Sequence, residues 1–411
     1  MDSTKQSWVQ YPEDHHFTIY NLPYGIFSTE ELSPRLGMAI GDQVVHMEAL
    51  RIAGGISAYD LGQTLLQHTM NDYIALGKSI TVRIREDIQS QLCDPESILA
   101  RNSNCLISMS EVKMHLPVSI GDYTDFYSSK EHATNLGMMF RDPDNALLPN
   151  WLHLPVGYHG RSSSIVVSGT DIKRPSGQTK PVDGPPVYGQ TKRLDFELEM
   201  AFIVGAGNQL GRPISIDHAD EHIFGMVIFN DWSARDIQKW EYVPLGPFLG
   251  KSFASSISPW VVTMEAMQPF AVKAPNQDPE VLPYLQSESR KNYDLSLEVA
   301  IKPESEEALT VSRSNFKYMY WTMQQQLAHH TINGCNVRVG DVMASGTISG
   351  VEENSYGSLL EITWAGKKPI VFPSGTTRKF LEDGDVVSMT AYARKGEVSI
   401  GFGEVRGKIV G

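Results

Sequence analysis

The chain has 411 residues, which is enough for two or three domains around a large hydrophobic core. Its 35 basic and 48 acidic residues give a net charge of −13, which argues against nonspecific binding to nucleic acid or to an anionic membrane surface. Hydrophobic residues make up 41% of the chain, and no run of about 18 apolar residues predicts a membrane span.

The cysteines are three in number, Cys93, Cys105 and Cys335, and no pair has the spacing of a zinc finger or a redox motif. The first ten residues lack the basic and apolar regions of a secretory signal. Both observations fit a protein of the reducing cytoplasm.

The first third of the chain reads as a small unit. Residues 34–47 predict two short strands around a Gly41–Asp42 turn, and residues 64–92 have apolar spacing typical of a helix. Proline and glycine interrupt the pattern near residue 116. We therefore predict a domain boundary there, between residues 1–116 and 117–411.

A histidine follows a carboxylate in segment 121–142. Asp125 and His132 are seven residues apart, so one helical face would carry both if the segment is helical. A histidine near a carboxylate that binds metal is a natural general base. The alternative is a histidine that is merely packed or at the surface.

The stretch LDFELEMAF, residues 194–202, alternates apolar and acidic residues, so a strand would place Asp195, Glu197 and Glu199 on one face. Like charges in a row repel, and Asp and Glu are poor strand formers. A divalent cation bound by their oxygens would offset that repulsion. A half-buried strand with a solvated acidic face is the alternative.

Segment 230–241 predicts a helix that places Asp231, Arg235 and Gln238 on one face. A loop rich in proline and glycine follows and presents Lys251, and such loops often carry function. The alternative is an exposed helix face with an ordinary ion pair.

Toward the C-terminus, residues 315–335 predict a helix capped by Ser314 or Asn315. The small residues of segment 344–350 can offer backbone N–H groups to an anion. Glu361 follows in a predicted strand, where a buried carboxylate needs a partner, and a histidine partner would form a base with its orienting group.

The rest of the larger unit contains many short segments in which apolar and polar residues alternate. This pattern predicts a largely β domain wound as a barrel, roll or sandwich. These strands are expected within residues 162–169, 194–205, 258–264, 294–301, 358–364, 385–393 and 398–405.

Six motifs together resemble the fumarylacetoacetase family, and the likeness runs from about residue 20 to residue 405. The resemblance implies a mainly β (α+β) fold, with a small N-terminal SH3-like barrel before a larger mixed β-roll catalytic domain, assembled as a homodimer. It also implies metal-dependent hydrolysis of the carbon–carbon bond of 4-fumarylacetoacetate, the last step of tyrosine and phenylalanine degradation. The motifs lie at residues 120–137, 150–161, 194–202, 230–253, 314–323 and 344–350.

The resemblance also implies a role for individual residues, while Asp195 has none in the family pattern. The ligands of a Ca²⁺ or Mg²⁺ ion would be Asp125, Glu197, Glu199 and Asp231, with a second cation near Asp231, Lys251 and Ser255. His132 would be the general base and Glu361 its partner, and Arg235, Gln238 and Lys251 would stabilise developing negative charge. Contacts to the dicarboxylate diketone substrate would come from Tyr127, Arg141, Tyr158, Gln238, Tyr242 and Thr347.

Two other functions compete with this one. A related acylpyruvate-type hydrolase would keep the acidic ligands but lose the match at Tyr127, Arg141 and Tyr158. A non-catalytic cation-binding protein would have no need of His132 or Glu361.

Overall fold

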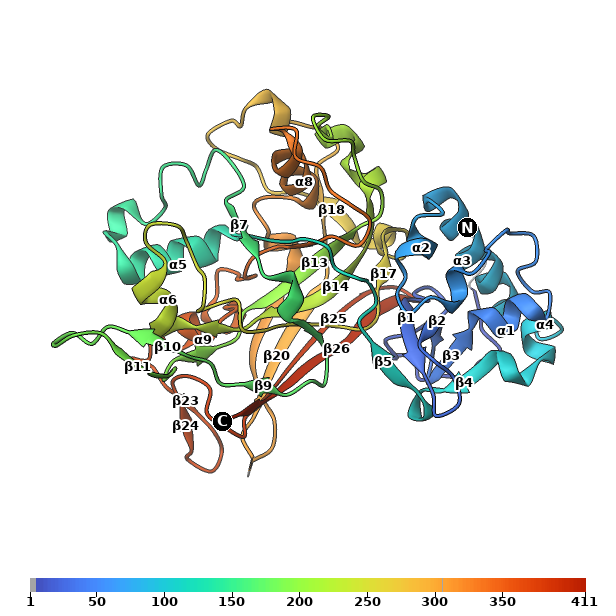
Figure 1. The fold of residues 1–411 in the computed structure, drawn as a ribbon, viewed down its shortest axis with the longest axis horizontal. Coiled ribbons are helices and arrows are strands. Elements are labelled where there is room, and N and C mark those ends of the chain that lie inside the picture. The colour runs from blue at the N-terminus through green and yellow to red at the C-terminus, as the bar shows by residue number, and fades with distance from the viewer. Residues whose placement is uncertain (1–4, 305) are drawn as a thin grey trace.

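The computed structural model describes residues 5–304 and 306–411, which form a small N-terminal unit beside a larger β-rich unit (Figure 1). The small unit contains a five-stranded antiparallel sheet in the order β4-β3-β2-β1-β5. Gly41 adopts φ +51° between β2 and β3, which confirms the predicted turn. The strands are β1 (Tyr24–Ser28), β2 (Arg35–Ile40), β3 (Gln43–His46), β4 (Leu106–Ser108) and β5 (Lys113–His115).

Helices accompany this sheet, but residues 64–92 do not form the single helix that their spacing predicted. A 3₁₀ turn at Thr64–Leu66, α2 (Asn71–Ile74) and α3 (Lys78–Cys93) divide the segment. Gly77, at φ +90°, separates α2 from α3, because a left-handed residue cannot continue a right-handed helix. The other helices of this unit are α1 (Met47–Ile52) and α4 (Ile98–Arg101).

An eight-stranded mixed sheet forms the centre of the larger unit, in the order β7-β6-β22-β13-β14-β16-β8, with β17 paired to β14. Strands β6 and β22 pair in parallel, although more than half of the larger unit lies between them along the chain. The strands are β6 (Tyr123–Phe126), β7 (Gly157–Gly160), β8 (Ile165–Val167), β13 (Leu198–Val204), β14 (Ile223–Asp231), β16 (Ser255–Ile257), β17 (Val262–Thr263) and β22 (Val342–Ala344).

The second large sheet has five strands in the order β21-β20-β25-β26-β9. The main hydrophobic core contains side chains from both large sheets, such as Leu297 of β20 and Met389 of β25 together with Met200 and Phe202 of β13. The strands are β9 (Ile172–Lys173), β20 (Ser296–Lys302), β21 (Leu309–Asn315), β25 (Val386–Lys395) and β26 (Val398–Val410). These sheets confirm the predicted mainly β architecture.

Strand β13 is buried on both faces. Met200 and Phe202 contribute to the main core, whereas Ala201 and Ile203 belong to a second core that also contains residues of the N-terminal unit. Central strands of this kind lack the polar face of a surface strand. A charged side chain on β13 is therefore buried whichever way it points.

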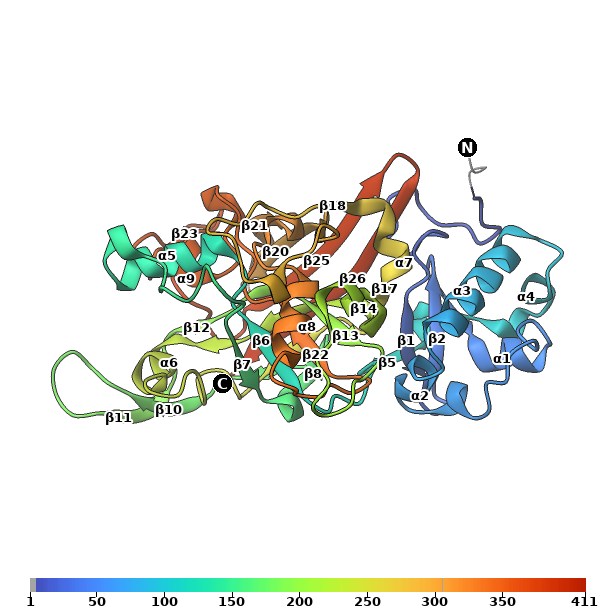
Figure 2. The same ribbon diagram turned by 90° about the horizontal axis from the view of Figure 1, so that it is seen from above.

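Helices and small hairpins gather at the end of the larger unit opposite the N-terminal unit, where α5, α6 and α9 lie (Figure 1). The β10–β11 hairpin projects farthest, beyond α6 (Figure 2). The three helices are α5 (Lys130–Phe140), α6 (Arg235–Glu241) and α9 (Leu359–Ile362). The larger unit also contains α7 (Met264–Met267) and α8 (Met323–Thr331). The paired short strands are β10 (Ser176–Thr179) with β11 (Val187–Gln190), β12 (Leu194–Asp195) with β15 (Ser233–Ala234), β18 (Ala271–Lys273) with β19 (Lys291–Tyr293), and β23 (Ile370–Val371) with β24 (Thr377–Arg378).

Near the C-terminus one predicted helix is shorter than expected and one predicted strand is wrong. Residues 315–335 hold a 3₁₀ turn and then α8, which starts after Thr322 because Thr322 and Gln325 form a capping box. Residues 358–364, predicted as a strand, contain the helix α9, because the Ser358 hydroxyl accepts a hydrogen bond from the backbone N–H of Glu361.

No helix within the described residues is long and apolar enough to cross a membrane.

Candidate active site

Four carboxylates meet at one end of the central sheet. Asp125, Glu197, Glu199 and Asp231 each place one oxygen within 4.8 Å of the others, and all four are buried. Asp125 lies on β6, Glu199 on β13 and Asp231 at the end of β14, and β22 bridges β6 and β13. Sheet pairing therefore brings together residues that are far apart in sequence.

The stretch 194–202 is not one continuous strand. β12 ends at Asp195 and β13 begins at Leu198, and Glu197 lies between them in an isolated bridge with Ser358. Glu197 and Glu199 belong to the acidic cluster, whereas Asp195 binds elsewhere. All three side chains are buried, so a solvated acidic face is excluded.

The helix predicted to carry both Asp125 and His132 does not exist. Asp125 is on β6, and His132 is on α5, which begins after Ser129 caps the backbone N–H of His132. Helical spacing therefore does not relate the two residues. The chain turns between strand and helix and still delivers both side chains to the same end of the sheet.

The predicted helix from Asn230 is also wrong in its first half. Asp231 ends β14, and residues 233–234 pair with β12 before α6 begins at Arg235. Arg235 and Gln238 share α6, but Asp231 is on a strand. Asn230 and Asp231 are extended and not helical because they continue the hydrogen-bonded pairing of β14 with β13 and β16.

Two buried cations bind the cluster. The Lys251 ammonium contacts Glu197 and lies 2.8 Å from Asp231 Oδ2. The Arg235 guanidinium is 2.6 Å from Glu197 Oε1 through Nη1 and donates from Nε to Asp195 Oδ2 at 2.8 Å. Glu197 therefore has two cationic partners.

The charges around the cluster are unequally balanced. Burial alone would raise the pKa of Glu197, but Arg235, Lys251 and His132 outweigh it and hold that pKa at about 2. Burial raises the pKa of Asp125 and Glu199 well above their ordinary values, and the neighbouring carboxylates add to the rise. The two raised values mark the part of the cluster that lacks positive charge.

The residues present fit a divalent cation. Oδ1 of Asp125 and Oε1 of Glu199 are buried and have no hydrogen-bond partner among the described residues. Such oxygens are rare in a folded protein unless something binds them. A donor set made only of carboxylate oxygens favours a hard cation such as Ca²⁺ or Mg²⁺ over zinc.

A histidine–carboxylate pair lies beside the cluster. His132 Nδ1 is 2.7 Å from Glu361 Oε2, and both side chains are buried. Burial would raise the pKa of Glu361, but His132 and its other hydrogen bonds lower it, so Glu361 is a carboxylate. With Nδ1–H donating to Glu361, Nε2 is left as the acceptor.

Three residues that the sequence analysis missed hold Glu361. Asn135 Nδ2 donates to Oε1 at 2.9 Å, the Ser349 hydroxyl lies 2.9 Å from the same oxygen, and the Ser358 hydroxyl donates to Oε2 at 2.8 Å. Asn135 follows His132 by three residues on α5, a spacing that puts both on one helix face. That spacing was the available signal.

Segment 344–350 supplies donors to the site, as its small residues indicated, but to protein carboxylates. The Gly346 backbone N–H donates to Glu199 Oε2 at 3.1 Å. Gly346 has φ +77°, and a Cβ there would lie 2.2 Å from the Phe126 carbonyl oxygen. Glycine is required at this position for both reasons.

The remaining predicted residues are spread around the cluster. The Tyr158 hydroxyl donates to Asp231 Oδ2 and the Ser255 hydroxyl to Asp231 Oδ1, both at 2.9 Å. Tyr127 packs its ring edge-on against His132, with centroids 5.3 Å apart. Arg141 donates to the Ala146 carbonyl. Among the described residues, no side-chain hydrogen bond joins the cluster to Gln238 (half-buried), Tyr242 (exposed) or Thr347 (buried).

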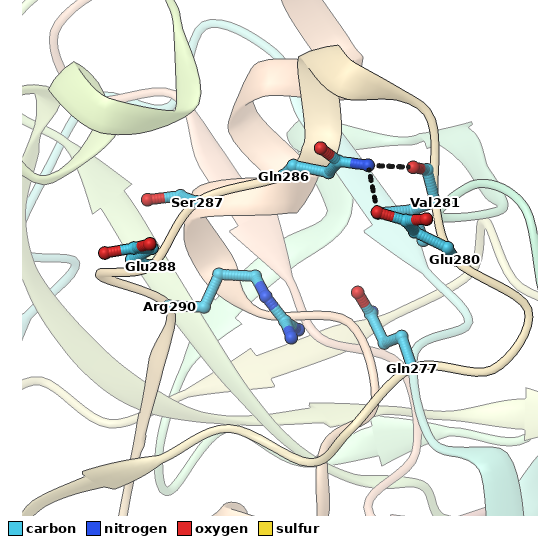
Figure 3. Close-up of a pocket in the computed structure, with 7 residues that line it drawn as sticks. All are labelled: Gln277, Glu280, Val281, Gln286, Ser287, Glu288 and Arg290. Atoms are coloured by element: carbon cyan, nitrogen blue, oxygen red, sulfur yellow. Dashed lines mark hydrogen bonds between the residues drawn. The ribbon is translucent and has the colours of Figure 1, made fainter.

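A separate surface pocket of about 350 Å³ lies in the loop region of residues 277–290 (Figure 3). Gln286 donates there to Glu280 and to the Val281 carbonyl. Its wall contains acidic and basic side chains, Glu288 and Arg290 among them, so the pocket does not favour a ligand of either charge. None of the predicted site residues lines it.

Comparisons with known proteins agree along the whole chain. The family description "Fumarylacetoacetase N-terminal" matches residues 20–117, and "Fumarylacetoacetate (FAA) hydrolase C-terminal" matches residues 122–410. The chain is 55% identical over 412 residues to "Fumarylacetoacetase" of Homo sapiens and 51% identical over 415 residues to that of Arabidopsis thaliana, covering 98% of each chain in both comparisons.

A solved structure shares the fold at lower identity. A fumarylacetoacetate hydrolase from the psychrophilic Exiguobacterium antarcticum matches with a TM-score of 0.51 and 18% identity, over 95% of this chain and 99% of that chain. At that identity the likeness concerns the fold alone.

Replacement of Glu199 by glutamine should weaken Ca²⁺ and Mg²⁺ binding at least about tenfold, because it removes a charged oxygen while keeping the shape of the side chain. Titration calorimetry on the purified chain measures this. Glu404→Gln is the control, since Glu404 is an exposed carboxylate of β26 outside the cluster. Unchanged affinity in Glu199→Gln would remove Glu199 from the cation site.

Cation binding should release protons. The raised pKa values of Asp125 and Glu199 mean that these groups retain protons above their ordinary values of 3.8 and 4.5, and a divalent cation must displace them. The affinity should therefore rise with pH above those ordinary values, and calorimetry in buffers of different ionisation enthalpy should detect the released protons. By the same sign, Asp125 and Glu199 should contribute a loss of stability to the cation-free chain as pH rises above those ordinary values, a loss that Asp125→Asn should reduce. A cation affinity and an unfolding free energy that do not change with pH would contradict this account.

Proposed function

The chain belongs to the fumarylacetoacetase family, and we propose that it hydrolyses the carbon–carbon bond of 4-fumarylacetoacetate to fumarate and acetoacetate. This reaction is the last step of tyrosine and phenylalanine degradation. One observation carries the proposal: a buried histidine–carboxylate pair stands beside a buried cluster of four carboxylates and two cations. A protein that only binds a cation has no need of such a pair.

The cation is Ca²⁺ or Mg²⁺, held by Asp125, Glu197, Glu199 and Asp231. Such an ion would polarise a carbonyl group of the substrate and help to orient it. The proposal includes a second cation near Asp231, Lys251 and Ser255. Because a protonated ammonium has no lone pair to offer, Lys251 can serve that cation only through its backbone carbonyl.

His132 is the general base. Its Nδ1–H is held by Glu361, so Nε2 takes the proton of the attacking water and Glu361 stabilises the resulting imidazolium. The water oxygen bonds to the carbonyl carbon on the fumaryl side. The bond between that carbon and the acetoacetate carbon then breaks, and the electron pair leaves with the acetoacetate fragment as an enolate, which is finally protonated.

Negative charge that develops on the leaving enolate needs positive potential. Arg235, Gln238 and Lys251 supply it, because preorganised groups in a buried site cost no reorganisation during the reaction. Arg235 Nη2 is buried and has no hydrogen-bond partner among the described residues, so it is available to a substrate oxygen.

The substrate carries a carboxylate at each end, and this protein, although its net charge is negative, needs groups that bind both. We assign these contacts to Tyr127, Arg141, Tyr158, Gln238, Tyr242 and Thr347. Arginine suits a carboxylate because its fork donates two parallel hydrogen bonds.

The assembly is a homodimer in the cytoplasm. Large apolar side chains are exposed here, as at many subunit interfaces: Tyr188 of the β10–β11 hairpin is 80% exposed, and Leu245 and Phe248 of the loop after α6 are 96% and 67% exposed. All three cysteines are free, which fits a reducing compartment. A monomeric mass in sedimentation velocity would contradict the dimer.

Purified chain with Mg²⁺ or Ca²⁺ should remove the diketone absorbance of fumarylacetoacetate, and His132→Ala should abolish that turnover while still binding the cation. A simple acylpyruvate, offered in the same assay, tests the related acylpyruvate-type hydrolase. No turnover of either compound by the wild-type chain would favour a non-catalytic cation-binding protein.

Lys251→Met should lower kcat and kcat/KM together by about a hundredfold, roughly 3 kcal/mol, because it deletes one preorganised charge and keeps the apolar stem. The Michaelis constant should change little, since the interaction strengthens only in the transition state. Lys291→Met, which removes an ion pair with Asp220 outside the site, is the control. A much higher Michaelis constant with intact kcat would make Lys251 an anchor for a substrate carboxylate.

A further inference from the structure

We propose that Asp195 is a positioning residue for this reaction, which fixes Arg235 and helix α9 to each other. Through Arg235 it sets the geometry of the charged groups around Glu197, and through α9 it sets the place of Glu361 and therefore of His132. The inference rests on the proposed function and deepens it by naming a residue that joins the two halves of the site.

Both carboxylate oxygens of Asp195 accept hydrogen bonds. Oδ2 accepts from Arg235 Nε at 2.8 Å and from the Leu360 backbone N–H at 3.0 Å, and Oδ1 accepts from the Leu359 backbone N–H at 2.8 Å. The side chain is fully buried. A carboxylate with one cationic and two backbone donors is well held, and its loss would free groups on two different elements.

The bond to Arg235 determines which guanidinium nitrogens remain available. Nε binds Asp195 and Nη1 binds Glu197, which leaves Nη2 buried without a partner among the described residues. Two carboxylates that contact different nitrogens of one planar guanidinium fix its orientation. Without Asp195, the guanidinium can rotate toward Glu197 and withdraw Nη2.

The bonds to Leu359 and Leu360 hold the first turn of α9. This helix has four residues, Leu359–Ile362, and a helix of that length is unstable unless its ends are held. Ser358 accepts from the Glu361 N–H, while Asp195 accepts from the two N–H groups before it. Glu361 lies next along the same turn and meets His132 at 2.7 Å.

A purely structural role is the competing explanation, since any buried carboxylate with an arginine partner stabilises a fold. The chain offers a matched control in Asp385. This residue is fully buried, accepts from Arg378 Nε and Nη2 at 2.9 and 3.0 Å, and accepts from the Glu382 backbone N–H at 2.8 Å. It reproduces the chemistry of Asp195 at a place that contacts neither Glu361 nor the acidic cluster.

The test compares Asp195→Asn with Asp385→Asn in the full chain. Asp195→Asn should lower kcat by about 10- to 100-fold with the Michaelis constant and the Ca²⁺ affinity within about threefold of wild type. Asp385→Asn should lose similar thermal stability while kcat stays within about twofold of wild type. Hydrogen exchange at residues 358–362 should accelerate in Asp195→Asn and not in Asp385→Asn.

A double variant tests the route through Glu361. If Asp195 acts by placing α9, the loss in kcat for Asp195→Asn with Glu361→Gln should be smaller than the product of the two single losses. Asp195→Glu, which keeps the charge but displaces it by one methylene, should also lose kcat, and it serves if the asparagine variant does not fold.

Equal kcat in wild type and both Asp195 variants, or a full product of losses in the double variant, would overturn the inference. Absence of turnover in the wild-type chain would instead refute the proposed function.

Discussion

Four carboxylates buried within 4.8 Å of one another are the constraint on which the rest of this structure depends. Isolated buried charges are strongly unfavourable, and like charges at this separation add repulsion. The protein balances part of the charge with Lys251 and Arg235, both buried and both bound to Glu197. Asp125 and Glu199 form no ion pair with the other described residues, and burial, followed by the neighbouring carboxylates, raises the pKa of both well above the ordinary value. A divalent cation bound by the four carboxylates would offset this repulsion, so the same unfavourable clustering of charge makes a candidate metal site.

Helix α9 shows how a short element can be maintained inside such a site. Its first turn is held by Ser358 and Asp195, and its Glu361 is surrounded by donors from α5 and from segment 344–350. The fold therefore holds the His132–Glu361 pair through several elements at once. Positioning of this kind matters because a displacement of about 1 Å can reduce a rate by roughly a hundredfold.

The sequence was informative about chemistry and less so about local structure. The alternation of residues 194–202 predicted three acidic side chains on one face, and Glu197 and Glu199 do lie in one cluster, but the strand breaks at Glu197 and Asp195 binds Arg235 instead. Periodicity could not show this, because the break follows from pairing of β12 with β15 and of β13 with β14. Glu361 was placed on a strand because its neighbours are apolar, whereas a serine cap and the carboxylate of Asp195 make a helix there. The roles proposed for the site residues came from the family resemblance. The local backbone conformation, in contrast, depends on contacts between segments that are distant in sequence.

The parallel pairing of β6 with β22 has a consequence for folding. Tyr123 of β6 pairs with Val342 of β22, so Asp125 reaches the cluster only after the chain has closed a very long loop. Long-range parallel pairing is slow, because the entropy of loop closure is lost before the contacts form. No fragment that ends before β22 can assemble the four carboxylates in this way. A cation that binds them therefore stabilises the completed chain and gives no help to earlier intermediates, including those that emerge from the ribosome.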